Sequence, residues 1–285
     1  MRMLSEGALR GLLYIHRYRY LTIPQFARVA SFSDYHSAEV LRTLEGRGQL
    51  GYFGFFTIPG QGRTPKVYYL KKKGYELLTR EVEEVGKFVS LDDITWTPQT
   101  YHRLKLIDMC LSLEAAVTKR PHLQLVKTFL EYRGRETTDF LAEPHTSINR
   151  LVPDGAFILE NTETGNRGLF FIEINMGTER IVTQSKHEYH QTVHFKLSRY
   201  DRYLQSGNFA TTYAEHGRFR SFILLFITQG HERIEHIRRA VVDLPSKLHS
   251  YYRFTTFADA QIDFFGSVWK SRAISDTLKY PLVKT

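Results

Sequence analysis

Apolar positions in the first fifty residues repeat at the spacing of helices that bury one face. The pattern predicts a first helix whose buried side carries Leu4, Ala8, Leu12 and Ile15. The segment LTIPQFARVAS predicts a second helix, because Thr22 can cap it and Pro24 is acceptable in a first turn. A third helix, DYHSAEVLRTLEGRG, is predicted to follow the cap Ser33 and to stop at Gly46 and Gly48.

The third predicted helix has an apolar face, and two strand patterns follow it. The residues expected to point inward are Ser37, Val40, Leu41 and Leu44. Next, LGYFGFFTI and KVYYLKKKG predict two strands around PGQGRTP, a Gly- and Pro-rich tip. Three helices followed by a hairpin with a basic tip are typical of a winged helix-turn-helix domain, in which the third helix enters the major groove of DNA.

Five side chains are the candidates for DNA contact in such a domain. Tyr35, His36 and Arg42 lie on the outward face of the third helix, where they suit contacts with base edges or phosphates. Arg63 and Lys66 lie on the wing and suit phosphate contacts. A winged helix that contacts proteins is the alternative, and the basic wing favours DNA.

The chain beyond residue 98 alternates helical and strand patterns. The segment TYHRLKLIDMCLSLEAAVTKR predicts a long helix, and LQLVKTFLEYR, VPDGAFILE and GLFFIEINM predict three strands. A helix over about 186–205, the doubly buried strand RSFILLFIT, the helix HERIEHIRRAVVDL and the strand YRFTTFA are expected to follow. This order predicts an α/β domain with a mixed sheet.

A change of pattern in REVEEVGKFVSLDDITWTPQT separates the two parts of the chain. Acidic residues end a helix there, and glycine, aspartate and proline then interrupt any regular spacing. We therefore expect a DNA-binding winged-helix domain over residues 1–86, a linker over 87–98 and the α/β domain over 99–285.

Composition narrows the class of protein further. The net charge is +9, and residues 1–87 carry fourteen Lys or Arg against eight Asp or Glu, as expected of a segment that meets phosphates. Cys110 is the only cysteine, and no apolar run has the length needed to cross a bilayer or to form a signal-peptide core. We expect a soluble, cytoplasmic protein without membrane contact.

Two acidic residues of the α/β part carry the candidate chemistry. Asp154 begins the strand GAFILE, and Glu173 lies near the end of GLFFIEINM, its expected antiparallel neighbour across the turn NTETGNRG. A hairpin brings the start of one strand beside the end of the other, so we expect the two carboxylates to meet at one edge of the sheet. A Glu in an apolar run is costly unless it is paired or bound to a cation. Two carboxylates with a carbonyl and waters suit Mg²⁺ or Mn²⁺.

These residues resemble those of known nucleases. The series PD, about twenty residues, then E-x-[DEN] resembles the motif of the PD-(D/E)xK restriction-endonuclease-like nucleases. Over most of the chain, VPDGAF, FFIEINMGTE and FKLSRYDRYLQSG, followed by FILLFIT and HIRRA, resemble the replication-relaxation family, which includes MobC-type relaxases of mobilizable plasmids. The resemblance implies a winged helix joined to a restriction-endonuclease-like α/β domain.

The resemblance also implies roles for single residues. Asp154 and Glu173 would be the ligands of Mg²⁺ or Mn²⁺, and Glu179 would be an accessory acid. Asn175 departs from the Asp or Lys that such nucleases usually carry at the third place. A neutral amide can bind a metal or water, but it has no positive charge to lower the pKa of that water. A lysine from the next helix is therefore expected to compensate.

That lysine has two candidates. The residues on one stripe of the helix predicted after the second strand are Val182, Lys186, Tyr189, Val193, Lys196, Tyr200 and Tyr203. The family register through KLxxYxxYL favours Lys196, whereas the distance from the strand end favours Lys186. Either ammonium would stabilise charge on the scissile phosphate or orient the attacking water. The three tyrosines are expected to line a channel for the DNA strand.

The leading hypothesis, implied by the resemblance, is a metal-dependent, strand-specific endonuclease that nicks a plasmid transfer origin for conjugative mobilization. Its partners would be double-stranded plasmid DNA, the nicked single strand, and mobilization accessory and coupling proteins. The alternative is a non-catalytic replication initiator or regulator that keeps the nuclease scaffold, which Asn175 favours. A double-strand restriction-type nuclease is a third option. Relaxases with a His-hydrophobe-His metal site are disfavoured, because no two histidines are separated by one residue.

Overall fold

The fold is taken from a computed structural model, which describes residues 4–54, 57–58, 62–92, 97–130, 139–140, 150–185 and 187–283. The chain forms two compact units, Met1–Leu111 and Ser112–Thr285. The division falls inside the long helix α5 (Pro98–Thr118), and the linker over residues 87–98 stays a prediction. Within the described ranges, no helix combines the length and the apolar character needed to cross a bilayer.

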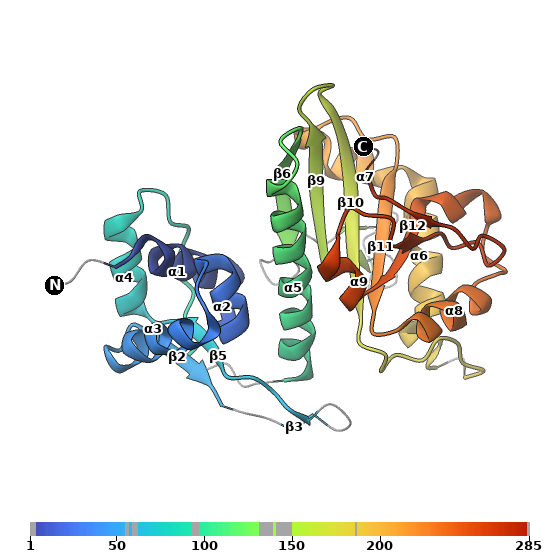
Figure 1. Cartoon of the computed structure of the whole chain (residues 1–285). Helices are drawn as coiled ribbons and strands as arrows, with labels where there is room; N and C mark the ends of the chain where they lie inside the picture. The colour runs from blue at the N-terminus through green and yellow to red at the C-terminus, as the bar shows by residue number, and fades with distance from the viewer. Residues whose placement is uncertain are drawn as a thin grey trace. The chain divides into compact units, whose positions relative to one another are not determined.

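The first unit combines helices with short antiparallel strands (Figure 1). Its elements before α5 are α1 (Glu6–Tyr18), β1 (Tyr20–Thr22), α2 (Ile23–Ala30), α3 (Asp34–Gly46), β2 (Leu50–Phe53), β3 (Thr57–Ile58), β4 (Gly62–Arg63), β5 (Val67–Leu70) and α4 (Lys72–Glu81). The sheet has the order β1-β5-β2, and β3 pairs antiparallel with β4. The strands of the β2–β5 and β3–β4 pairs therefore all lie between α3 and α4 in the chain.

The helix starts predicted for this unit are confirmed by their caps. Thr22 and Gln25 form a capping box at the start of α2, and Ser33 accepts a hydrogen bond from the backbone N–H of His36 at the start of α3. The second predicted strand ends earlier than expected, at Leu70. The next residues form α4, because Gly74, Leu77 and Leu78 fall at helical spacing and are buried.

The second unit is built on a seven-stranded mixed sheet of order β14-β13-β12-β11-β10-β9-β6. The strands are β6 (Leu123–Leu130), β9 (Gly155–Asn161), β10 (Asn166–Asn175), β11 (Phe222–Thr228), β12 (Tyr252–Thr256), β13 (Trp269–Lys270) and β14 (Lys279–Tyr280). Strands β10, β11 and β12 are parallel to one another, whereas β9 runs antiparallel to both β6 and β10. Two further strands, β7 (Asp139–Phe140) and β8 (Arg150–Leu151), pair separately. The predicted α/β class with a mixed sheet is confirmed.

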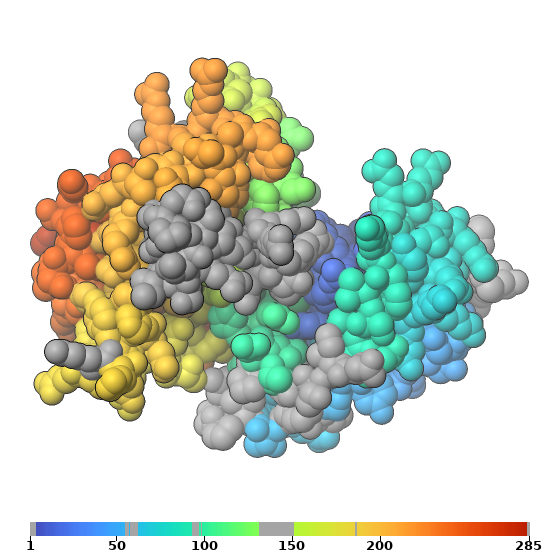
Figure 2. Space-filling model, turned by 180° about the vertical axis from the view of Figure 1, so that it is seen from behind, coloured from blue at the N-terminus to red at the C-terminus, as the bar shows by residue number. Residues whose placement is uncertain are grey.

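Helices cover both faces of this sheet (Figure 1). Helices α6 (Val193–Ser206), α7 (Asn208–Thr212) and α8 (His231–Ala240) lie on one face, and α9 (Phe257–Ile262) lies on the other. Short 3₁₀ helices occur at Tyr189–Gln191, Ala214–His216 and Ser246–Tyr251. Seen from behind, the yellow-to-orange part of the chain, which includes α6 and α7, forms much of the surface of this unit (Figure 2).

The helix predicted over 186–205 begins later than expected, at Val193. Thr192 caps it by accepting a hydrogen bond from the backbone N–H of Phe195. The backbone N–H groups of its first two residues donate to carbonyl oxygens of the preceding loop. The loop therefore folds back along the start of the helix instead of extending it.

Of the residues on the predicted stripe, only those from Val193 onward lie in the helix. Lys196, Tyr200 and Tyr203 share the side of α6 that faces the sheet, whereas Tyr189 lies in the 3₁₀ helix before it. The rings of Tyr200 and Tyr203 have no exposed surface and pack near Phe171 in the core. The prediction that these two tyrosines line a strand channel is wrong, because burial removes them from any ligand that approaches from solvent.

Candidate active site

The hairpin of β9 and β10 brings two carboxylates to one edge of the sheet. Gly155 pairs with Ile172, so the residues just beyond this pair, Asp154 and Glu173, are neighbours. Oδ2 of Asp154 accepts a hydrogen bond of 2.7 Å from the backbone N–H of Ile174. The antiparallel pairing predicted from the sequence is confirmed, and its register sets the positions of both acids.

Glu173 is a buried carboxylate held by two donors. Its exposed fraction is 2%, because Tyr200 and Lys196 of α6 lie over it. The Tyr200 hydroxyl donates to Oε1, and Nζ of Lys196 donates to Oε2 at 3.1 Å. Burial raises the pKa of Glu173 to about 7; the charge of Asp154 adds to the rise, and Lys196 and Tyr200 oppose it.

Lys196 joins two acids that come from different segments. Its Nζ lies 3.1 Å from Oε2 of Glu173 and 3.1 Å from Oε1 of Glu179. Burial lowers the pKa of Lys196, but the charges of Glu173, Glu179 and Asp154 outweigh burial and raise it, so the ammonium stays protonated. Of the two lysines predicted from the sequence, Lys196 is placed at the carboxylates, and Lys186 lies outside the described residues.

Asn175 occupies the third place of the motif and forms hydrogen bonds in several directions. Its Nδ2 donates to Oε2 of Glu179 at 2.7 Å. Its Oδ1 accepts from the Gly177 backbone, Thr228 Oγ1 and Arg233 Nε at 3.2, 3.3 and 3.2 Å. Gly177 has a φ of 79°, a conformation that favours glycine, and the chain turns there so that Glu179 returns to Asn175. The amide oxygen is thus already shared by three donors, which argues for a positioning role.

Sequence reasoning missed Arg233 and Thr228. Arg233, on α8, also donates through Nη2 to the carbonyl oxygen of Glu179. Thr228 ends β11 opposite Asn175, at the ends of two parallel strands. Because the helix after a parallel strand begins at that same edge, the first turn of HERIEHIRRA was the available indication that Arg233 reaches the site.

Asp154 and Glu173 supply carboxylate oxygens, which are the donors that a hard divalent cation prefers. Mg²⁺ commonly keeps several waters and uses only one or two protein carboxylates. A cation there would offset the repulsion between the two acids, which contributes to the raised pKa of Glu173. In the described part of the chain, no group of three or more His, Cys, Asp and Glu side chains is arranged to hold a metal ion. Waters and a carbonyl would therefore complete the coordination.

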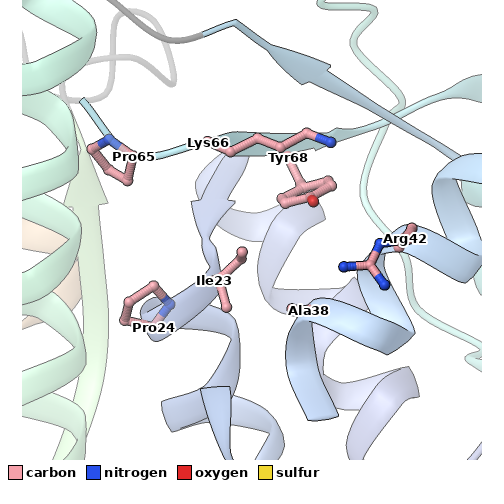
Figure 3. Close-up of a pocket in the computed structure, with 7 residues that line it drawn as sticks. All are labelled: Ile23, Pro24, Ala38, Arg42, Pro65, Lys66 and Tyr68. Atoms are coloured by element: carbon pink, nitrogen blue, oxygen red, sulfur yellow. The ribbon is translucent and has the colours of Figure 1, made fainter. Parts of the chain in front are cut away.

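A cleft of about 380 Å³ in the first unit contains two of the predicted DNA-contacting residues (Figure 3). It is lined by Ile23, Pro24, Ala38, Arg42, Pro65, Lys66 and Tyr68. Arg42 comes from α3 and Lys66 directly precedes β5, so a helix and a strand face each other across the cleft. The walls of the cleft are mainly apolar, and Arg42 and Lys66 are its two charged residues.

The other predicted contact residues lie on the surface of this unit. Tyr35 is 75% exposed, and His36 and Arg63 are also exposed. Lys66 is not presented to solvent in the way the sequence suggested. Its Nζ lies 2.7 Å from Oε2 of Glu45 and 3.7 Å from the ring centroid of Tyr52, so its charge is compensated.

Comparison with protein families places the chain in one of them. The sequence model of a family described as Replication-relaxation matches residues 12–217, which is more than half of the chain. The match includes Asp154, Glu173 and Lys196 and ends before Thr228 and Arg233. No curated protein matches the sequence.

Proposed function

The chain belongs to the replication-relaxation family, and from this premise we propose that it is a metal-dependent endonuclease that nicks one strand of plasmid DNA at a transfer origin. Membership of the family suggests a role in plasmid replication or mobilization. The observation that carries the finer proposal is the meeting of Asp154, Glu173 and Lys196 at one sheet edge. Two adjacent carboxylates can hold a divalent cation, and an ammonium beside them can stabilise negative charge on a phosphate.

Each residue of the site has a distinct role in this proposal. Asp154 and Glu173 would hold Mg²⁺ or Mn²⁺, which would supply Lewis-acid activation when bound. Lys196 places a positive charge beside them, where negative charge grows on the phosphate during cleavage. Asn175 and Arg233 orient Glu179, and Glu179 in turn holds the Lys196 ammonium. The second unit is then a restriction-endonuclease-like domain of the PD-(D/E)xK type.

The first unit serves as the DNA reader in this proposal. The order of α1, β1, α2, α3 and the ladder of β2 and β5 supports a winged helix-turn-helix domain. Exposed Tyr35 and Arg42 on α3 then face the bases, and the β3–β4 ribbon with Arg63 serves as the wing. The duplex partner is plasmid DNA, and mobilization accessory and coupling proteins are the expected protein partners.

A non-catalytic initiator or regulator is the second candidate, and one observation favours it. Both carboxylate oxygens of Glu173 already accept hydrogen bonds, one from Tyr200 and one from Lys196. The charge of this acid is therefore compensated within the protein. In that case the nuclease scaffold is a second binding surface.

Supercoiled plasmid carrying the cognate origin separates these candidates. With Mn²⁺ or Mg²⁺ we expect open circles, because a nick in one strand releases supercoiling, and with EDTA we expect intact supercoils. Gel electrophoresis after a fixed time measures both forms. Linear product would indicate double-strand cleavage, and intact supercoils with metal would favour the non-catalytic candidate.

The effect of metal on thermal stability is expected to depend on pH. The pKa of Glu173 is raised from 4.5 to about 7 in the folded state, so its protonation favours folding. That contribution is complete below about pH 4.5 and is lost as pH rises through 7. A divalent cation binds the ionised form, so a near-saturating concentration of Mn²⁺ should raise Tm by about 5 °C at pH 8 and by clearly less at pH 6. Equal shifts at both pH values, or the same shift in Asp154→Asn, would contradict metal binding by these acids.

A further inference from the structure

Three residues of α6 form a stripe beside Lys196. Phe195, Arg199 and Arg202 are separated by four and three positions, so they follow one side of the helix. The guanidinium carbons of Arg199 and Arg202 lie 5.8 and 5.9 Å from the centroid of the Phe195 ring. The stripe therefore combines an aromatic ring with two cations next to the lysine of the candidate active site.

Within the described part of the protein, the two arginines of this stripe have no ion-pair partner. Nε and Nη2 of Arg199 are buried and have no hydrogen-bond partner there. Neither Arg199 nor Arg202 forms an ion pair with a described residue. Burial lowers the pKa of Arg199, and the charge of Arg202 lowers it further. The neighbouring acid, Asp201, points away from both and pairs with buried Arg272.

Such an arrangement costs folding free energy. Buried donors without acceptors and like charges at short range both destabilise the folded chain. The buried Nε and Nη2 of Arg199 are out of reach of solvent, but Arg202 is exposed and Arg199 is only half-buried. An anion at the stripe would supply charge of the opposite sign there and offset the repulsion between the two arginines. The missing partner is therefore anionic.

The position of the stripe identifies the anion. Lys196, one residue after Phe195, contacts Glu173, and the charge of Glu173 acts on Arg199 as well. An anion bound at the stripe would therefore lie on the helix that carries Lys196. A ring beside arginines is an arrangement that proteins use to bind single strands, since a ring can stack on a base and arginines contact phosphates.

We propose that the Phe195–Arg199–Arg202 stripe binds a single strand of DNA next to the candidate active site. Arg199 and Arg202 contact successive phosphates, and Phe195 supports a base. The choice of DNA as the ligand rests on the proposed function. The binding itself requires neither a metal ion nor cleavage.

Fluorescence anisotropy with the full chain, in EDTA, tests this site. The probe is a labelled single-stranded oligonucleotide of mixed sequence, and a duplex of the same sequence is measured in parallel. Arg199→Gln and Arg202→Gln are each expected to weaken single-strand binding about tenfold, since each removes charge-assisted hydrogen bonds. The slope of log affinity against log salt should fall by about 0.7 for each lost phosphate contact. Duplex binding should change by less than about twofold, because the other unit supplies it.

Arg220→Gln is the matched control, since Arg220 is an exposed arginine of the same unit outside α6. It should bind the single strand like the wild type. Unchanged single-strand binding by Arg199→Gln and Arg202→Gln would overturn the proposal. An equal loss of single-strand and duplex binding would overturn it as well, because the stripe would then not be specific for a single strand.

Thermal stability separates a binding role from a structural role. Arg199→Met removes buried, unpartnered donors, so its Tm should equal or exceed that of the wild type while single-strand binding is lost. A lower Tm with normal binding would show that Arg199 serves the fold and would overturn the proposal. Binding is measured without metal, so its outcome does not depend on cleavage. An absence of plasmid nicking by the wild type would contradict the proposed function without affecting this site.

Discussion

Asp154→Asn and Glu173→Gln are each expected to reduce the rate of plasmid nicking by at least about 10³-fold. Either amide removes the negative charge that would hold a divalent cation. Each keeps an oxygen that can accept the hydrogen bond now made by the Ile174 N–H or the Tyr200 hydroxyl, so the fold should persist. The measurement is the initial rate at which supercoiled plasmid becomes open circular, at a fixed Mn²⁺ concentration.

Glu160→Gln is the control for this pair. Glu160 lies on the same strand, β9, but at its other end, where it pairs with Arg167 on the neighbouring β10. The control should nick like the wild type, and all three variants should retain binding to duplex DNA. Wild-type rates in both Asp154→Asn and Glu173→Gln would show that these acids are not the catalytic pair.

Arg272→Ala is expected to lower the free energy of unfolding by about 3–5 kcal/mol. The Arg272 side chain is fully buried, and its Nη1 lies 2.8 Å from Oδ1 of Asp201. The Tyr252 hydroxyl donates to the same carboxylate oxygen at 2.6 Å. Without Arg272, the buried Asp201 carboxylate keeps its hydrogen bond from Tyr252 but loses its cationic partner. Urea denaturation followed by circular dichroism measures the change.

Two further variants define the origin of that loss. Asp201→Leu combined with Arg272→Met removes both charges together, so it should recover most of the stability. Arg180→Ala breaks an exposed pair with Glu188 and should cost no more than about 1 kcal/mol. A change below about 1 kcal/mol in Arg272→Ala would mean that the buried pair does not hold α6 to the sheet.

This pair also bears on the candidate site. Asp201 lies on α6, the helix that carries Lys196, whereas Arg272 follows β13. The pair therefore fixes α6 to the far end of the sheet while Lys196 contacts Glu173. Arg272 lies 71 residues from Asp201 and beyond the residues matched by the family, so no local pattern indicated it.

Features with a short-range cause were predictable from the sequence. The caps Thr22 and Ser33 lie within three residues of the N–H groups that they bind. The turn between β9 and β10 and the two-residue alternation of strands predict that Asp154 lies beside Glu173, as the structure has it. The change of pattern over residues 80–100 indicated two parts, whereas the two compact units divide inside α5.

Features with a long-range cause required the tertiary structure. The sequence left two lysines open, and only the packing of α6 on the sheet placed Lys196 against Glu173, 23 residues away. From the sequence, Asn175 was a possible ligand of metal or water that departs from the usual motif. In the structure, its Oδ1 accepts hydrogen bonds from Thr228 and from Arg233, 58 residues later.

The same division explains the tyrosines and the arginines of α6. Helical spacing alone could not distinguish a core position from a ligand-facing one, so Tyr200 was expected in a channel and is found in the core. Arg199 carried no local indication of a role, because its lack of a partner is a property of the folded surroundings. The backbone period and the hydrogen bonds within a turn depend on a few neighbouring residues, so they can be predicted from the sequence. The partner of a buried charge is decided by which distant segments pack together.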